Sequence, residues 1–419
     1  MHSGAEQTRP RIQVSNLVRA SFLWPARVVS QPLTLSQILS SASGAGLMLI
    51  GASAMEPSEF ALFALFTLTS LMLVNLFREA LFQPALIARR LHENAYVPLR
   101  YALIAALFSV VAMLGTTWAF GVRDPASLAG LAVSAAFPVF FDWQRYRAIG
   151  QDRRWAVAHA DLIRFVLTIA ALASAALCSN AVALQIYGSA LTVVPMVFLL
   201  LRLPRIARWE PYRTYRRAAG WQLVDFAFGS TLIAVPLLFL GGAGEPESVS
   251  GVRLAQSLLG PLNLALAAAA SNLVADGVTR AEFASPRAII SRGIALGRLL
   301  AGLAILLVAS LILVVAATGF AFRGVSNSAL LLGLSLVGAA LITNGWSSIN
   351  AIVLRILDRQ GRVTLGRAII AVLTVTSFVV GYALSGTTAS LVAGFLTLAV
   401  ASPLVFITMS ARSYPALQS

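Results

Sequence analysis

Six residues recur at steps of three and four along an otherwise apolar stretch: Arg253, Gln256, Gly260, Asn263, Ala267 and Ser271. In an α-helix this spacing places them on one face. A guanidinium and two amides on one face of an apolar helix can bind anions, hydroxyl groups or water. We interpret the helix as one that lines a cavity; the alternative is a helix packed through its small residues. Arg253 and Asn263 are larger than packing requires, which favours the cavity.

Other ionisable residues lie inside or at the ends of apolar stretches. Asp225 lies about one helical turn after the start of the apolar span 221–243. At this position it can carry a coupling proton, or it can simply be a favourable negative charge near a helix N-terminus. Arg78 and Glu79 can reach inward or snorkel to the membrane interface. Asp161 and Arg164 are one turn apart, and we expect them to form an intrahelical ion pair.

No motif in the chain points to catalysis. The three histidines lack metal-ligand spacing, the single Cys178 cannot build a cysteine-rich metal site, and there is no Walker sequence or nucleophile elbow. We therefore expect no metal, no cofactor and no enzymatic activity. A membrane glycosyltransferase or acyltransferase usually presents catalytic acids or histidines on a sizeable outer loop, and the outer loops expected here are short turns. A pure scaffold is hard to reconcile with Arg253 inside a span.

Twelve apolar spans are predicted to position these residues: 33–55, 60–83, 98–121, 126–144, 157–178, 181–203, 221–243, 249–274, 293–320, 328–353, 364–385 and 387–410. Each has about 20 residues or more, enough for a helix to cross a hydrocarbon core of about 30 Å. Apolar residues make up 58% of the chain and charged residues 11%, too few to cover a soluble protein. The continuous apolar runs also lack the alternation of barrel strands. The sequence predicts an all-α, polytopic membrane protein.

The arginines predict its orientation. All 31 basic residues are arginine, and 26 of them lie in the two tails and five alternate loops or within a few residues of them, whereas Arg123 and Arg323 fall in the opposite loops. Cytoplasmic loops keep positive charge during insertion, so both termini are predicted to be cytoplasmic. We therefore expect the arginines that give the net charge of +15 to attract anionic lipid headgroups and not nucleic acid. Heavy use of arginine and alanine suggests a GC-rich bacterial genome and hence a bacterial plasma (inner) membrane.

The chain is predicted to contain two related halves. The turn 56–59 and the turn 245–248 lie 189 residues apart at equivalent positions, and the loops 146–154 and 354–362 form a second pair. Two parallel six-helix repeats are a transporter architecture. The expected parts are a tail 1–32, a six-helix lobe 33–203, a basic linker 204–220, a second six-helix lobe 221–410 and a tail 411–419.

Several short segments are similar to one family of transporters. They are the serine-rich first span, the stretch Phe77-Arg78-Glu79-Ala80-Leu81-Phe82-Gln83-Pro84, the arginine-rich loop from Asp142 to Arg154, and Ala255-Gln256-Ser257-Leu258-Leu259-Gly260-Pro261-Leu262-Asn263. With them the chain resembles the polysaccharide-exporter branch of the multidrug/oligosaccharidyl-lipid/polysaccharide (MOP) flippase superfamily. The resemblance implies two six-helix lobes around a central cavity that opens alternately to the two sides. It also implies a lipid-linked oligosaccharide as cargo.

Such a cargo implies roles for the residues above. A polyprenyl-diphosphate sugar cannot take its charged head through hydrocarbon unaided, so a hydrated, cationic cavity is expected. Arginine suits the diphosphate because its planar fork bonds two oxygens at once. We expect Arg78 and Arg253 to contact phosphate, Gln256 and Asn263 to contact sugar or water, and Asp225 to act in coupling or gating.

The expected partners are membrane lipids, the lipid-linked glycan, a coupling ion (H⁺ or Na⁺) and polysaccharide-assembly proteins. The alternative is an ion-coupled small-molecule exporter of the multidrug type, with a similar architecture. Transport of a dye without any effect on lipid-linked sugars would favour this alternative.

Overall fold

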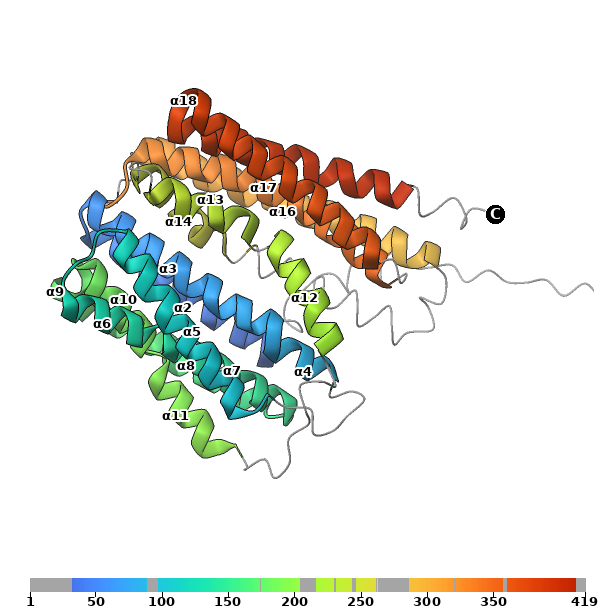
Figure 1. Ribbon diagram of the computed structural model, residues 1–419. Coiled ribbons are helices and arrows are strands. Elements are labelled where there is room, and N and C mark those ends of the chain that lie inside the picture. Colours follow the sequence, from blue (N-terminus) through green and yellow to red (C-terminus); the bar gives the residue numbers. More distant parts are fainter. Residues whose placement is uncertain are drawn as a thin grey trace, which may run out of the picture.

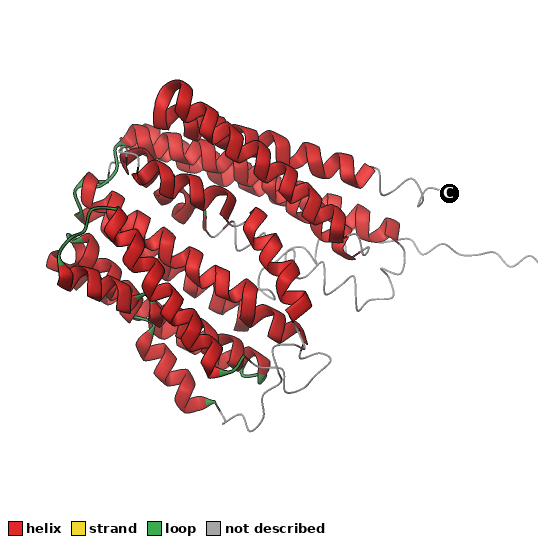
Figure 2. Cartoon of the chain, viewed as in Figure 1, coloured by secondary structure: helices red, strands yellow, loops and turns green. Residues whose placement is uncertain are grey.

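The structure, a computed structural model, describes residues 32–88, 97–173, 175–203, 216–229, 231–242, 246–260, 262, 286–319, 322–356 and 360–411. Across this part of the chain helices are joined by short loops, as Figure 2 shows, with one isolated β-bridge between Phe322 and Val325. Eight of the described helices are long and apolar enough to cross a membrane. The predicted all-α, polytopic membrane class is confirmed.

The first half of the chain forms a bundle that we call the N lobe. Its elements are α2 (Pro32–Ala54), α3 (Pro57–Phe77), the π-helix η1 (Arg78–Phe82), α4 (Gln83–Ala88), α5 (Leu99–Ala119), α6 (Pro125–Ser134), α7 (Ala136–Gly150), α8 (Arg154–Ala170), the 3₁₀ turn η2 (Ala171–Ala173), α9 (Ala175–Cys178), α10 (Ala181–Ala190) and α11 (Val193–Arg202). Several predicted spans thus consist of two consecutive helices, such as α6 with α7. Within the lobe, α2 packs on α8, and α5 packs on α6 and α7.

The second half forms the C lobe, which lies beside the N lobe in Figure 1. Its elements are α12 (Arg216–Gly229), α13 (Thr231–Gly242), α14 (Pro246–Leu258), α16 (Pro286–Thr318), α17 (Asn327–Ile356) and α18 (Gln360–Ala411). In this lobe α17 packs against α14, α16 and α18. The chain of α18 is broken at Ser385 and Gly386, and Gly386 has a φ of 78°, which glycine adopts without strain. The break falls at the predicted turn between the last two spans.

Proline fixes the start of two equivalent helices. Pro57 begins α3 and Pro246 begins α14, 189 residues apart, and proline suits a first helical turn because its missing N–H would have no partner there. One predicted boundary is wrong. The fourth span was expected to end at residue 144, followed by an arginine-rich loop, but α7 continues to Gly150 and carries Arg145 and Arg147 on a helix.

The two lobes contact each other along α3. Helices α13 and α14 of the C lobe pack on α3, and α14 also packs on α2. At the end that holds the α2–α3 and α16–α17 connections, here called the turn end, the Gly324 N–H donates to the Ala52 carbonyl at 2.7 Å. At the same end Arg323 pairs with Glu56 at 2.6 Å. The lobes are therefore joined at the turn end by a backbone hydrogen bond and an ion pair.

Candidate functional site

A cluster of charged side chains is buried inside the N lobe, and four elements supply it. We call it the N-lobe charge cluster: Ser36 of α2, Arg78 of η1, Asp142 and Arg145 of α7, and Asp161 of α8. Asp142 is 2% exposed and Asp161 is fully buried. A charge at such a position inside a membrane protein is costly unless it is paired.

Two carboxylates compensate two guanidinium groups in this cluster. Arg78 donates from Nε and Nη2 to the two oxygens of Asp142, both at 3.1 Å, which is the bidentate geometry. Arg145 bridges the carboxylates, with Nη1 3.3 Å from Asp142 and Nη2 3.1 Å from Asp161. The Ser36 hydroxyl donates to the same oxygen of Asp161 at 2.5 Å. Asp161 Oδ1 keeps no hydrogen-bond partner among the described residues.

The π-helix places Arg78 in this cluster. Pro84 lacks the N–H that would bond to the carbonyl of residue 80, and the chain from Arg78 to Phe82 winds as a π-helix just before it. The extra residue per turn changes the direction of the side chains that follow α3. Asn75, one turn earlier, accepts from Arg78 Nη1 at 3.0 Å. Arg78, predicted to contact a diphosphate, thus has three hydrogen bonds to its own lobe.

The expected ion pair between Asp161 and Arg164 is wrong. In the described part of the chain, the salt-bridge partner of Asp161 is Arg145, which belongs to α7 and not to its own helix. Arg145 and Asp142 were treated as part of a loop, so their role was missed. The available signal was their spacing of three residues, which puts opposite charges on one helix face.

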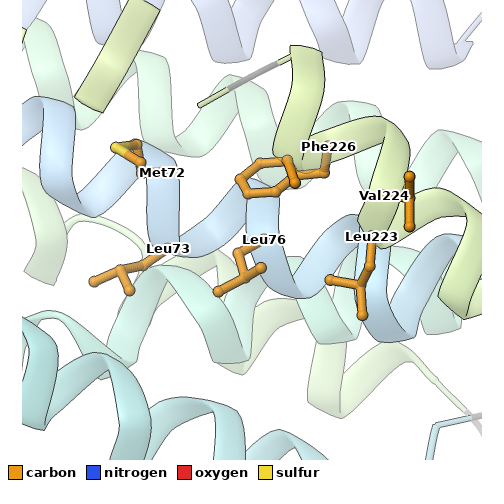
Figure 3. A pocket seen from close by; sticks show the side chains of 7 residues that line it. Met72, Leu73, Leu76, Leu223, Val224 and Phe226 are labelled. Carbon is orange, nitrogen blue, oxygen red and sulfur yellow. The ribbon is translucent and has the colours of Figure 1, made fainter. Parts of the chain in front are cut away.

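A pocket of about 480 Å³ lies between the lobes. Met72, Leu73 and Leu76 of α3 line one side, and Leu223, Val224, Phe226 and Ala227 of α12 line the other. Figure 3 shows Phe226 and Leu223 next to Leu76. Every lining residue is apolar, and the volume is in the range of small-molecule sites. None of the residues predicted to bind a substrate lines this pocket.

Arg253 does not line this pocket and lies on α14, the helix that packs on α3 and α2 of the N lobe and on α17 of its own lobe. Its residue exposure is 6%, and Nη1 donates to Gln256 Oε1 at 2.5 Å. Its Nε has no partner, and no described residue forms a salt bridge with it. Arg253 and Gln256 therefore lie together on one face, as predicted. The contrast with the N-lobe charge cluster is that no counter-charge accompanies this arginine.

For two further predicted site residues, Asp225 and Asn263, the structure does not describe the side chain. Asp225 is in α12, beside the pocket residues Val224 and Phe226 in sequence, but its side chain lies outside the described part. Asn263 lies outside the described residues altogether. Their expected roles in coupling and in sugar binding stay predictions.

Known structures share this arrangement of helices. The chain is similar to an inward-facing multidrug resistance MATE family transporter of the MOP superfamily, with 15% identity, a TM-score of 0.63 and coverage of 91% of this chain and 95% of the other. An outward-facing structure of such a transporter gives 14% identity, a TM-score of 0.62 and coverage of 92% and 94%. The chain has the fold of a MOP superfamily transporter.

A third solved structure is a MOP superfamily transporter from Pyrococcus furiosus, with 13% identity, a TM-score of 0.58 and coverage of 94% of this chain and 98% of the other. That protein is described as having a binding pocket of reversed polarity, which suggests a different function for it. No protein-family model matches the chain, and no curated protein matches it in sequence. The likeness covers nearly the whole chain and confirms two lobes of transmembrane helices.

The similarity to solved structures supports less than the resemblance expected from the sequence, which named one branch of the superfamily. It supports the superfamily fold, and the neighbours named above are described as multidrug resistance or MOP transporters rather than polysaccharide exporters. They are transporters, not enzymes.

Proposed function

We propose that this protein is an ion-coupled exporter of small amphipathic molecules that works by alternating access between the two lobes. The observation that carries the proposal is the apolar pocket of about 480 Å³ between α3 and α12, in a chain with a MOP transporter fold. A pocket bounded by one wall from each lobe changes shape whenever the lobes move against each other. Its lining suits an apolar body, and it offers no polar side chain to a sugar.

The coupling group in this proposal is a buried carboxylate. Asp161 is the described carboxylate with the clearest capacity to exchange a proton or cation, because one oxygen has no partner while the other is held by Arg145 and Ser36. Asp225 on α12 is the second candidate, as predicted from its position. A bacterial plasma membrane, with its proton and sodium gradients, is the proposed location.

The second candidate function is flipping of a polyprenyl-diphosphate-linked oligosaccharide. The observation that favours it is Arg253, a buried cation on α14 for which no described residue supplies a counter-charge. The observation against it is Arg78, whose guanidinium is already bound by Asp142 and Asn75. One arginine is a weak match for a diphosphate, which offers several charged oxygens to planar donors.

Reconstitution into sealed liposomes tests the two functions together. In one arm, liposomes that contain the full chain receive fluorescent amphipathic probes of positive, zero or negative charge under an imposed pH or sodium gradient. In a parallel arm, a short-chain polyprenyl-diphosphate oligosaccharide is placed in one leaflet. We expect movement of at least one probe that depends on the gradient, and no movement of the glycan lipid.

The matched variants are Asp161→Asn and Asp225→Asn. We expect one of them to abolish the dependence on the gradient while the protein still exchanges probe across the membrane. Movement of the glycan lipid with no movement of any probe would replace the proposed function with the second candidate.

A further inference from the structure

Arg253 is a buried cation with no salt-bridge partner among the residues that the structure describes. It lies seven residues after the start of α14, about 10 Å along the helix. It is 6% exposed, and its one side-chain partner in the described part of the chain is the neutral Gln256. A desolvated guanidinium without a counter-charge is strongly unfavourable, and an anion from outside the chain would supply the charge that no described residue supplies.

The face of α14 that carries Arg253 is turned toward the N lobe. Gly251, on the opposite side of α14, is packed so closely on α17 that a Cβ there would come within 2.4 Å of the Ala329 carbonyl oxygen. Helix α14 also packs on α3 and α2 of the N lobe, and a Cβ at Gly260, just beyond its end at Leu258, would lie 3.1 Å from the Ser41 hydroxyl of α2. The arginine therefore faces the lobe interface and not the interior of the C lobe.

Groups that can complete an anion site surround this face. The Gln256 amide oxygen accepts from Arg253 Nη1, and its amide nitrogen can donate to an anion. Arg253 Nε is without a partner among the described residues. The neighbouring side chains on α14, Val252 and Leu254, are buried and apolar. The site thus combines one cation and neutral hydrogen-bond donors with apolar surroundings.

We infer that Arg253, with Gln256, binds the oxyanion of an amphipathic molecule where α14 faces the N lobe, so that the cargo is an amphipathic carboxylate, sulfonate or phosphate ester. This rests on the proposed function, which it narrows from small amphipathic molecules to anionic ones. A planar guanidinium donates two parallel hydrogen bonds to such a group. Export of the anion would also be favoured by an inside-negative membrane potential, by about 2.3 kcal/mol per charge for each 100 mV.

A pair of probes with the same apolar body tests the charge directly. The full chain, purified in a neutral maltoside detergent, is titrated with 1-pyrenebutyrate and with 1-pyrenemethylammonium, and binding is followed by fluorescence anisotropy. We expect the anion to bind at least about tenfold more tightly than the cation, because a charged hydrogen-bond partner is lost in the second case. Equal affinity, or tighter binding of the cation, would overturn the inference.

Variants assign the binding to one residue. Arg253→Gln should weaken binding of pyrenebutyrate by at least about tenfold and leave pyrenemethylammonium unchanged, and Arg253→Lys should cause a smaller loss because it keeps the charge without the planar fork. Arg298→Gln, at an exposed arginine of the same lobe, is the control and should bind as the wild type does. Unchanged binding in Arg253→Gln, or an equal loss in Arg298→Gln, contradicts the assignment.

A competition experiment with lipids distinguishes a bound cargo molecule from a bound lipid headgroup. Displacement of pyrenebutyrate by short-chain phosphatidylglycerol, but not by short-chain phosphatidylcholine, would assign the site to a lipid headgroup and overturn the cargo assignment. Since binding in detergent needs no gradient, anion binding without any transport in liposomes would contradict the proposed function alone. Transport of probes without anion binding would contradict this inference alone.

Discussion

The two lobes differ in whether described carboxylates pair with their arginines. In the N lobe, Arg78 and Arg145 are held by two carboxylates from α7 and α8. In the C lobe, Arg253 is more deeply buried than Arg78, and its described side-chain partner is the neutral Gln256. The first arrangement satisfies its charges within the chain, whereas the second leaves a charge to be satisfied by something else.

The comparison separates a structural role from a binding role. A buried ion pair contributes little to stability compared with an apolar pair of the same volume, but removing one partner is severe because the other is left alone. Removal of Asp142, which holds both arginines of the N-lobe charge cluster, should therefore lower stability. Arg253 should respond by losing a ligand.

The largest effect is expected for Asp142→Asn in the N-lobe charge cluster. Arg78 and Arg145 would both lose the carboxylate that holds them, which should lower the free energy of unfolding by about 3–5 kcal/mol. Unfolding in mixed detergent micelles measures this loss. The control is Asp152→Asn, because Asp152 and Arg154 form a pair whose side chains are both mostly exposed, and its loss should cost less than about 1 kcal/mol. Similar losses in the two variants would remove the distinction.

A smaller effect is expected on the packed side of α14. Gly251→Ala would force a methyl group onto the α17 backbone at Ala329 and should cost about 1–3 kcal/mol by overpacking. Gly302→Ala on α16 is the control, since a Cβ there meets nothing within 4 Å, and it should be neutral or slightly stabilising. Anion binding should survive Gly251→Ala in protein that remains folded. A selective loss of that binding, with stability unchanged, would mean that the two faces of α14 are not separate in role.

The smallest effect is expected at the turn end. Glu56 and Arg323 pair across the lobes, but both side chains are more than half exposed, so Glu56→Gln should change the free energy of unfolding by less than about 1 kcal/mol. The backbone hydrogen bond from Gly324 to Ala52 would remain. A loss as large as that of Asp142→Asn, measured in the same micelles, would show that exposure does not explain the difference between these ion pairs.

The sequence predicted the spans well and their contacts poorly. Hydropathy and turn residues are local, so the break at Ser385 and Gly386 and the starts of α3 and α14 could be located from the chain alone. The N-lobe charge cluster joins Ser36 to Asp161 over 125 residues, and this pairing depends on how α2 packs on α8. The same long-range packing replaced the expected local pair of Asp161 and Arg164.

The face that carries Arg253 shows the same limit. Periodicity placed Arg253 and Gln256 together, which the structure confirms. It could not show that this face is turned toward α2, or that no described carboxylate reaches the arginine, because both facts depend on the neighbouring helices. The described pocket between the lobes is apolar and Arg253 does not line it, so the expected hydrated, cationic cavity stays a prediction.

The most direct test is the thermal stability of Arg253→Met in neutral detergent without any added anion. An apolar side chain of similar length removes an uncompensated buried charge, so we expect the variant to melt at a higher temperature than the wild type, and we expect pyrenebutyrate to stabilise the wild type alone. A lower melting temperature for Arg253→Met, with pyrenebutyrate stabilising both proteins equally, would show that Arg253 is compensated within the fold and would contradict the account.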